Sequence, residues 1–316
     1  MNAIEIILLV FSSLVILVFG VSLYCFFKVF YAKSRVPLAE GEFKIPDGEI
    51  YEAIRPQIEG WISDIREMPH ENVEIKSYDG LTLRGQLFEY EPGAPLEILF
   101  HGYRGNAESD LSGGVHRCRA LGRSALLVDH RASGKSDGHV ITFGIKERLD
   151  CLEWIKFVIS RYGEQQKIIL TGVSMGAATV MMAAGEDLPK NVQHVLADCG
   201  YSSAKEIIKK IIAEMHLPPS LVYPFVWLGA RIFGGFNLEE TSPMEGVKNA
   251  KVPVIFIHGD DDAFVPHNMS ERLYDACITK KKLVLIKDAG HGLAFPKAQE
   301  EYVEALRDFY AECGFI

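Results

Sequence analysis

The chain has 316 residues, of which 48% are hydrophobic, 24% charged and 10% aromatic. This is the composition of an ordinary globular protein, so it excludes a disordered chain and a fibrous repeat. Lys and Arg number 33 against 42 Asp and Glu, which gives a formal net charge of −9 without a long basic run. This balance argues against binding to a phosphate backbone, so no nucleic-acid partner is expected.

The six cysteines are scattered along the chain and form neither a CxxC pair nor a Cys/His zinc spacing. We therefore expect neither a metal nor another cofactor. In a chain large enough to bury its own core, such sparse spacing favours reduced thiols over a disulfide framework, as in cytoplasmic proteins.

The N-terminal segment is apolar enough to cross a membrane. Residues 6–27 form a run of 22 residues without a charged side chain. As a helix this run extends about 33 Å, compared with about 30 Å for the hydrocarbon core of a bilayer. A cleaved signal peptide fits less well, because no basic residue precedes the run and no small-residue cleavage motif follows it. We predict a transmembrane anchor over residues 1–36, with the lipid bilayer as its partner.

The flanking charges predict the orientation of this anchor. Lys28, Lys33 and Arg35 follow the apolar run, whereas neither Lys nor Arg precedes it. The positive-inside rule then places the rest of the chain in the cytoplasm, as a single-pass protein of the cell membrane. Residues 37–70 are interpreted as a linker and lead-in segment, because Pro and Gly recur in their first half.

From residue 71 onward, extended segments alternate with helical ones. Helices are predicted over 113–121 and 143–162, and the first two strands form a hairpin around the turn at 78–80. Continuous apolar strands between helices indicate a mostly parallel sheet that is covered on both faces. Residues 71–316 are therefore predicted to form one α/β domain, with its catalytic groups at the carboxyl ends of the strands. The predicted strands are 72–77, 81–90, 96–100, 124–129, 167–171, 192–197, 252–257 and 282–286.

Residues 201–250 interrupt the alternation over a length that a simple crossover does not need. We interpret this segment as an inserted helical cap, with apolar helices over 205–215 and 221–233. Packing of the cap onto the core is the plain explanation for these apolar side chains. An acyl-binding or membrane-facing surface is the alternative.

The pattern G-x-S-x-G, which marks the nucleophile of many hydrolases, occurs twice, around Ser136 and around Ser174. A nucleophile turn needs a strand that runs straight into a tight turn and then into a helix. Ser174 has this context, because strand 167–171 precedes it and an apolar helix opens at Gly176. Ser136 is followed by a polar turn, so we expect a solvated loop there. Ser174 is the predicted nucleophile.

A serine hydroxyl is a poor nucleophile at neutral pH and needs a general base that a carboxylate orients. Enzymes with this turn have the chain order Ser, acid, His. His291 lies in a glycine-flanked loop after the last predicted strand, so it is the candidate base. The loop after the preceding strand offers three adjacent acids, of which we select Asp262 over Asp260 and Asp261.

Two other interpretations of the acidic residues remain open. The three neighbouring carboxylates could form a cation site, but ligands in calcium loops alternate along the chain. Asp198, which ends strand 192–197, is a second candidate for the catalytic acid or a residue of the pocket wall.

The oxyanion of an acyl-transfer intermediate needs two backbone amides as hydrogen-bond donors. The first is the amide of Met175, directly after the nucleophile. The second is the amide of Tyr103, in the turn His101-Gly-Tyr-Arg-Gly105 after strand 96–100, where glycines permit close backbone approach. His101 lies on the wrong strand for a general base, so we expect it to be structural.

The motifs HGYRG (101–105), DHRASGKSDG (129–138), GVSMG (172–176), HGDDDAFVP (258–266) and AGHG (289–292) occur in this order. Together they resemble the α/β-hydrolase superfamily, and within it serine hydrolases that include membrane-anchored bacterial proteins of the serine aminopeptidase-like and lysophospholipase-like group. The resemblance covers roughly residues 70–313 and implies the α/β-hydrolase fold. It also implies Asp262 as the acid, four positions after the histidine of the HG pair. The chain departs from the pattern at Ala132, where such proteins often have Gly.

We therefore expect a membrane-anchored serine hydrolase that cleaves a carboxylic ester of an acyl or lipid-like substrate through an acyl-enzyme. Ser174 attacks the carbonyl, His291 transfers the proton, Asp262 orients His291, and the amides of Tyr103 and Met175 bind the oxyanion. A serine peptidase or amidase acting on small substrates is the nearest alternative. A catalytically inactive binding module is another, although all three triad positions are filled.

Overall fold

The computed structural model of the protein describes residues 2–33 and 49–315. Eight strands form one sheet in the spatial order β1-β2-β4-β3-β5-β6-β7-β8. Strand β2 runs antiparallel to both of its neighbours, and the other neighbouring pairs are parallel. This arrangement confirms the predicted mostly parallel sheet. The bounds are β1 (Glu71–Lys76), β2 (Thr82–Phe88), β3 (Leu96–Phe100), β4 (Ser124–Val128), β5 (Ile168–Val173), β6 (Val192–Asp198), β7 (Val254–Gly259) and β8 (Lys281–Ile286).

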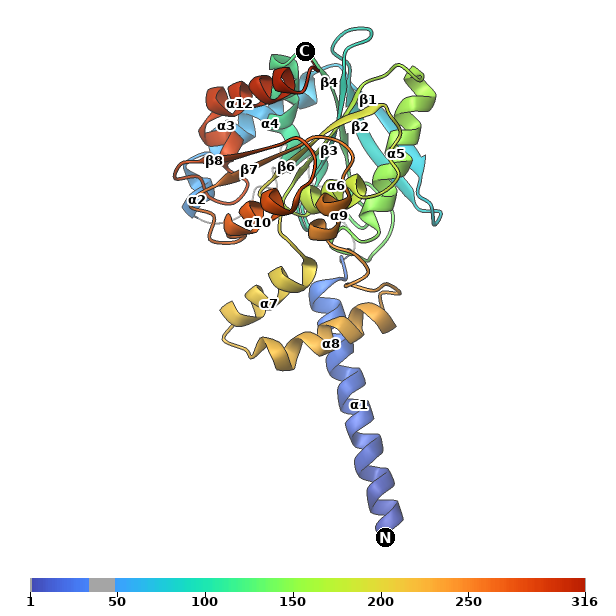
Figure 1. The fold of residues 1–316 in the computed structure, drawn as a ribbon. Helices are drawn as coiled ribbons and strands as arrows, with labels where there is room; N and C mark the ends of the chain where they lie inside the picture. Colours follow the sequence, from blue (N-terminus) through green and yellow to red (C-terminus); the bar gives the residue numbers. More distant parts are fainter. Residues whose placement is uncertain (1, 34–48, 316) are drawn as a thin grey trace.

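Helices cover both faces of the sheet, which is why its central strands are buried along nearly their whole length (Figure 1). One face carries α3 (Arg55–Glu67), α4 (Ala107–Ala120) and α12 (Gln299–Glu312). The other carries α5 (Glu147–Tyr162), α6 (Met175–Ala184), α9 (Pro243–Asn249) and α10 (Asn268–Ala276). Two short helices, α2 (Glu49–Glu52) and α11 (Ala294–Lys297), complete the body.

The lead-in segment before the sheet contains an ordered helix. Helix α3 buries Ile62 and Ile65, and Arg66 forms an ion pair with Glu108 of α4 at 2.8 Å. Pro56 stands in the first turn of α3, where proline is well tolerated, so it opens this helix instead of marking a loop. The part of the predicted linker at 37–48 lies outside the described residues.

Helix α1 (Ala3–Val29) extends away from the body and places the N-terminus far from the sheet (Figure 1). Its start is fixed by a capping box, in which Asn2 accepts from the amide of Glu5 and Glu5 accepts from the amide of Asn2. In the part of the chain that the structure describes, α1 is the one helix long and apolar enough to cross a membrane, and it is mostly exposed.

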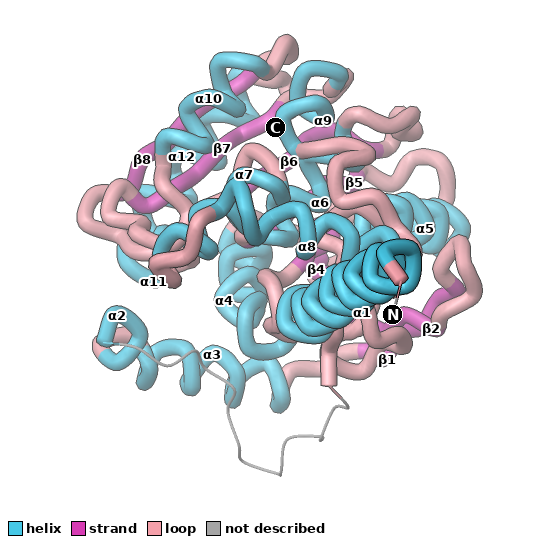
Figure 2. The backbone as a smooth tube through the Cα atoms, turned by 90° about the horizontal axis from the view of Figure 1, so that it is seen from below, coloured by secondary structure: helices cyan, strands magenta, loops and turns pink. Residues whose placement is uncertain are grey.

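The inserted segment forms helices α7 (Ala204–Glu214) and α8 (Pro219–Ile232), which lie beneath the body on the side of α1. Figure 2 shows α8 beside α1, and the two helices pack against each other. A Cβ atom placed on Gly229 of α8 would lie 2.6 Å from the carbonyl oxygen of Ser22, so this helix crossing requires glycine. The chain then returns to the body through α9, which packs on α6.

Candidate active site

Ser174 stands between strand β5 and helix α6, in a strained backbone conformation with φ 56° and ψ −114°. The two glycines of the motif are required by close backbone contacts. A Cβ atom on Gly172 would lie 2.1 Å from the carbonyl carbon of Gly176, and one on Gly176 would lie 2.0 Å from the carbonyl oxygen of Phe100. This is the geometry of a nucleophile turn, in which the serine side chain is presented at the carboxyl end of the sheet.

A chain of hydrogen bonds connects Ser174, His291 and Asp262. The hydroxyl oxygen of Ser174 lies 2.9 Å from Nε2 of His291, and Nδ1 of His291 lies 2.7 Å from Oδ2 of Asp262. Because the carboxylate accepts the proton of Nδ1, Nε2 is left to accept the hydroxyl proton. The three side chains come from the loops after β5, β7 and β8, and the structure brings all three predicted residues together.

Both oxygens of the Asp262 carboxylate accept two hydrogen bonds. Oδ1 accepts from the amides of Phe264 at 2.9 Å and Val265 at 2.8 Å. Oδ2 accepts from His291 and from Nε2 of the buried His258, at 3.0 Å. Burial raises the pKa of the Asp262 carboxyl, but the hydrogen bonds from His258 and His291 outweigh this effect and hold the pKa well below its ordinary value. Asp262 is therefore ionised at neutral pH.

His258 is a residue of the site that was not predicted from the sequence. A signal for it was present, because His258 is the histidine of the HG pair, four positions before the acid. Its other ring nitrogen, Nδ1, lies 2.7 Å from the hydroxyl of Ser270. His258 thus holds Oδ2 of Asp262, the same oxygen that accepts from His291, in place.

The other candidate acids have different partners. Asp260 is exposed and accepts a hydrogen bond from the amide of Asp288. Asp198 is buried at the end of β6, and its Oδ2 accepts from the hydroxyl of Tyr302 at 2.8 Å. Burial raises the pKa of Asp198. Of these carboxylates, that of Asp262 is the one bonded to His291.

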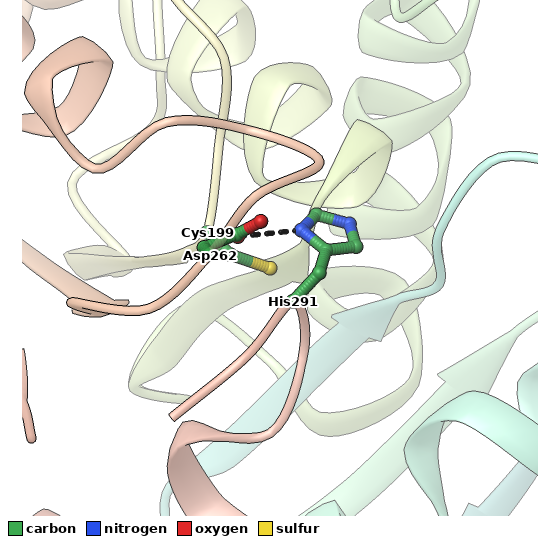
Figure 3. Close-up of side chains that lie close together, drawn as sticks. All are labelled: Cys199, Asp262 and His291. Carbon is green, nitrogen blue, oxygen red and sulfur yellow. Dashed lines mark hydrogen bonds and ion pairs between the residues drawn. The ribbon is translucent and has the colours of Figure 1, made fainter. Parts of the chain in front are cut away.

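Cys199, Asp262 and His291 lie close together (Figure 3), with potential ligand atoms within 4.8 Å of one another. A cysteine binds a metal as the thiolate, yet burial raises the pKa of the Cys199 thiol well above its ordinary value. In addition, Nδ1 of His291 already donates to Asp262. The chemistry of this donor set fits a hydrogen-bonded catalytic pair beside a neutral thiol better than a metal site.

The two backbone amides predicted to bind the oxyanion belong to the residue after Ser174 and to the turn after β3. Met175 is the first residue of α6, so its amide belongs to the first turn, where helical amides have no partner within the helix. The turn after β3 lies against the nucleophile, since a Cβ atom on Gly102 would be 3.6 Å from Cβ of Ser174. In this turn the amide of Gly102 already donates to Asp110 at 3.0 Å. The amide of the next residue, Tyr103, is therefore still the candidate for the second oxyanion donor.

His101 is fully buried and shapes the same turn. Its Nδ1 donates to the carbonyl oxygen of Gly102 at 2.7 Å, and its Nε2 accepts from the amide of His130 at 3.0 Å. These two bonds fix the tautomer and occupy both ring nitrogens. His101 is structural, as predicted.

The expectation of a solvated loop at Ser136 is wrong. Ser136 is fully buried, its hydroxyl donates to the carbonyl oxygen of Asp129 at 2.7 Å, and it accepts from the amide of Arg84 at 2.8 Å. The serine thus satisfies backbone groups of β2 and of the residue after β4, and it has a structural role. In the same loop Ala132 has φ 58°, a left-handed conformation that explains why similar proteins often carry Gly there.

A cavity of about 240 Å³ opens beside the nucleophile. Ser174 and His291 are among its lining residues. Other parts of its wall come from α3, α4 and the loop after β8, with apolar side chains that include Trp61, Leu293 and Phe295. The walls contain no residue of the cap helices α7 and α8. An acyl-binding role of the cap is therefore not supported, and the cavity is the space available to a substrate.

A sequence model of the prolyl oligopeptidase family matches residues 142–314, more than half of the chain. The protein is 28% identical to YqkD of Bacillus subtilis over 213 residues, which cover 67% of this chain and 70% of that one. Its structure is similar to that of the Pyrococcus furiosus esterase Pf2001, with a TM-score of 0.63 and 22% identity over 86% of this chain and 96% of that chain.

It is also similar to the α/β hydrolase GrgF from Penicillium, with a TM-score of 0.62 and 19% identity over 78% of this chain and all of that one (100%). These similarities confirm the predicted α/β-hydrolase fold. The family match also confirms the predicted class of enzyme, a serine hydrolase. The chain belongs to the prolyl oligopeptidase family.

Proposed function

We propose that this protein is a membrane-anchored serine hydrolase that cleaves carboxylic esters of acyl or lipid-like substrates. The proposal depends on one observation, the chain of hydrogen bonds from Ser174 through His291 to Asp262. The hydroxyl oxygen of Ser174 lies 2.9 Å from Nε2 of His291, and Nδ1 of His291 lies 2.7 Å from Oδ2 of Asp262. Ser174 and His291 line a cavity, and the chain belongs to a serine hydrolase family. These residues supply a nucleophile, a general base and a group that orients the base.

In the proposed reaction, the hydroxyl oxygen of Ser174 attacks the acyl carbonyl while its proton passes to Nε2 of His291. Asp262 stabilises the resulting imidazolium, and the amides of Tyr103 and Met175 donate to the oxyanion. His291 then gives its proton to the departing alcohol, which leaves an acyl-enzyme. Water attacks this ester with His291 again as the base, and the acid is released.

The cavity supports an ester of an apolar acyl group. Trp61, Leu293 and Phe295 offer an apolar surface to an acyl chain, and burial of such a chain contributes about 0.8 kcal/mol per methylene. The structurally similar Pf2001 of Pyrococcus furiosus is named as an esterase, which supports this choice.

The exposed apolar surface supports a position at a membrane. The outer part of α1 is exposed. On α8, Leu221, Phe225, Leu228 and Ile232 follow the spacing of one helix face, and Leu221 and Ile232 are 65% and 49% exposed. Both helices lie at the same end of the molecule (Figure 1). A bilayer at this end would cover both surfaces.

The inner part of α1 argues against a cleaved signal sequence. Ser22, Phe26 and Phe30 are buried against the rest of the protein, so removal of α1 would expose their apolar partners. We propose that the anchor is retained. Because Lys28 and Lys33 follow the apolar run, we propose that the catalytic domain is cytoplasmic.

A peptidase or amidase is the second candidate, and the family match favours it. Recognition of a peptide amino terminus needs carboxylates that face the substrate. The acidic pair of the inserted segment has other partners, because Glu239 pairs with Lys205 at 2.7 Å and Glu240 with Arg148 at 2.7 Å. The carboxylates that do line the cavity also have partners, because Asp110 accepts from the amide of Gly102 and Asp198 from the hydroxyl of Tyr302. The ester is our first choice because of the apolar side chains in the cavity wall.

Hydrolysis by the full-length protein in detergent tests the proposal, with p-nitrophenyl esters from acetate to laurate and the p-nitroanilides of the same acyl groups. We expect ester turnover that exceeds anilide turnover for each acyl group and falls to background in Ser174→Ala. Faster anilide turnover would favour the amidase. Turnover that is unchanged in Ser174→Ala would overturn the assignment of the nucleophile.

A further inference from the structure

The C-terminal end of α1 is built into the hydrolase domain. Phe30, directly after the helix, is fully buried, and its ring meets those of Phe143 and Phe236 edge-to-face at centroid distances of 5.8 Å and 5.3 Å. Phe27, one turn from Phe30, is 50% exposed. The body of the protein therefore holds this end of α1 in place, whereas the outer part of α1 is apolar and exposed.

The backbone that leaves α1 continues the attachment. The amide of Ala32 donates to the carbonyl oxygen of His139, and the amide of Ile141 donates to that of Phe30, both at 2.8 Å. Tyr31 and Val140 form an antiparallel bridge between these bonds. The bridge joins the helix end to the loop that follows β4.

The turn that carries the Tyr103 amide is bonded to the same helix end. The hydroxyl of Tyr103 donates to the carbonyl oxygen of Val29 at 2.6 Å, and the guanidinium of Arg104 donates to that of Lys28 at 2.7 Å. The last carbonyls of a helix have no partner within it, so Tyr103 and Arg104 cap α1. The positive charge of Arg104 is also favourable at this helix end.

The turn is thus fixed from two sides. Within the domain, Asp110 of α4 accepts from the amide of Gly102 at 3.0 Å. On the opposite side, the side chains of Tyr103 and Arg104 are held by α1. Arg104 has φ 58°, a left-handed conformation that is costly for a residue other than glycine and persists only where its surroundings hold it.

We propose that the last turn of α1 positions the oxyanion-binding turn, so that catalysis depends on contacts of the anchor with Tyr103 and Arg104 and not only on attachment to a membrane. This inference rests on the proposed function, in which the amide of Tyr103 donates to the oxyanion. An oxyanion donor acts through its fixed position, and loss of one such donor lowers kcat about 100- to 1,000-fold. Loosening the turn without removing the amide costs part of that factor.

The test uses full-length variants in one detergent, with two matched pairs. Tyr103→Phe removes the bond to α1 and keeps the amide, and Tyr90→Phe makes the same change at an exposed site away from the turn. Phe30→Ala removes a ring that packs on the body, and Phe27→Ala removes an exposed ring of the same helix. For each variant, kcat and KM for p-nitrophenyl butyrate, the rate of fluorophosphonate labelling and the thermal midpoint are measured.

We expect Tyr103→Phe to lower kcat and the labelling rate about tenfold or more, with KM within twofold, because a positioning defect weakens the transition state and not substrate binding. Phe30→Ala should act in the same direction, and both controls should stay within twofold of wild type. Arg104→Lys keeps a hydrogen-bond donor for the backbone carbonyl oxygen of Lys28, so it should retain more activity than Arg104→Ala.

Wild-type kcat and a wild-type labelling rate in Tyr103→Phe would overturn the inference. This variant keeps the aromatic ring at position 103, so it tests the inference even if Phe30→Ala does not fold. A fall in the thermal midpoint without a fall in kcat would show a purely structural contact and would overturn it as well. If wild type itself shows no hydrolysis dependent on Ser174, the proposed function fails. If wild type is active and all four ring variants match it, only the inference about α1 fails.

Discussion

Replacement of Asp262 by Asn tests the chain of hydrogen bonds most sharply, because the two groups have nearly the same shape. The amides of Phe264 and Val265 both donate to Oδ1, so they hold the side-chain oxygen of the new Asn at that position. Its NH₂ group must then face Nδ1 of His291, where Oδ2 accepts a proton in the native protein. To accept from this NH₂ group, His258 must move its ring proton from Nε2 to Nδ1 and donate to Ser270. The carbonyl oxygen of Val265, 2.8 Å from Nε2, then loses its donor, so we expect a modest loss of stability as well.

The consequence is a wrong tautomer of His291. When an NH₂ group donates to Nδ1, the ring proton moves to Nε2, which can no longer accept the proton of Ser174. This removes general-base assistance and lowers kcat by about 10³ to 10⁴, or roughly 4 to 5.5 kcal/mol of transition-state stabilisation. Asp260→Asn, in the same loop but exposed and bonded to the amide of Asp288, is the control and should stay within twofold of wild type.

The assay is single-turnover hydrolysis of p-nitrophenyl butyrate by full-length protein, together with circular dichroism to compare the folds. A folded Asp262→Asn that retains more than one tenth of the wild-type kcat would refute the reasoning. The same result with a large loss in Asp260→Asn or Asp198→Asn would reassign the acid.

Three further predictions concern the turn, the core and the topology. Gly176→Ala places a Cβ atom 2.0 Å from the carbonyl oxygen of Phe100, so we expect a lower thermal midpoint and loss of activity, and an active, equally stable variant would contradict the packing argument. Burial lowers the pKa of His194 to about 4, so the folded protein resists its protonation while the unfolded chain takes up the proton as the pH falls below about 6.5. Stability is thus lost between these pH values, by about 2 kcal/mol at pH 5 and about 3 kcal/mol at pH 4. In thermal melts from pH 7.5 to pH 5, His194→Phe should remove the loss of about 2 kcal/mol. A cysteine at the exposed Ile278, in a Cys313→Ser background, should react with a membrane-impermeant maleimide only after cell lysis, and reaction in intact cells would contradict a cytoplasmic domain.

The strands and the parallel sheet were predictable from local sequence, because each central strand is a short and mostly apolar run between turn residues. The run at 96–100 is β3 in the structure, and 192–197 lacks only the last residue of β6. Helix α4 was predicted to begin at 113 but begins at Ala107, after the N-cap Asn106. Its first turn contains Glu108 and Asp110, which bond to other parts of the protein. The periodic spacing of apolar residues that predicts a helix is therefore missing from this turn.

The arrangement of the site residues was predictable where the requirement is local, and less so where it depends on distant contacts. The context of Ser174 and the loop of His291 could be recognised from the sequence alone. The burial of Ser136 depends on Asp129 and Arg84, which lie on two different strand ends. The bond from Tyr103 to Val29 joins residues 74 positions apart and follows from where the end of α1 meets the body. No pattern along the chain predicts such a contact.

The most direct measurement is covalent labelling of the full-length protein, in detergent or liposomes, with a fluorophosphonate, followed by mass spectrometry of the modified peptide. The two G-x-S-x-G motifs make this a comparison within one molecule, since Ser174 is bonded to His291 and Ser136 is bonded to backbone groups. We predict one modification, on Ser174, that is absent in Ser174→Ala and at least 100-fold slower in Asp262→Asn. Labelling of Ser136 or another serine, or an equal rate in Asp262→Asn, would contradict the proposed triad.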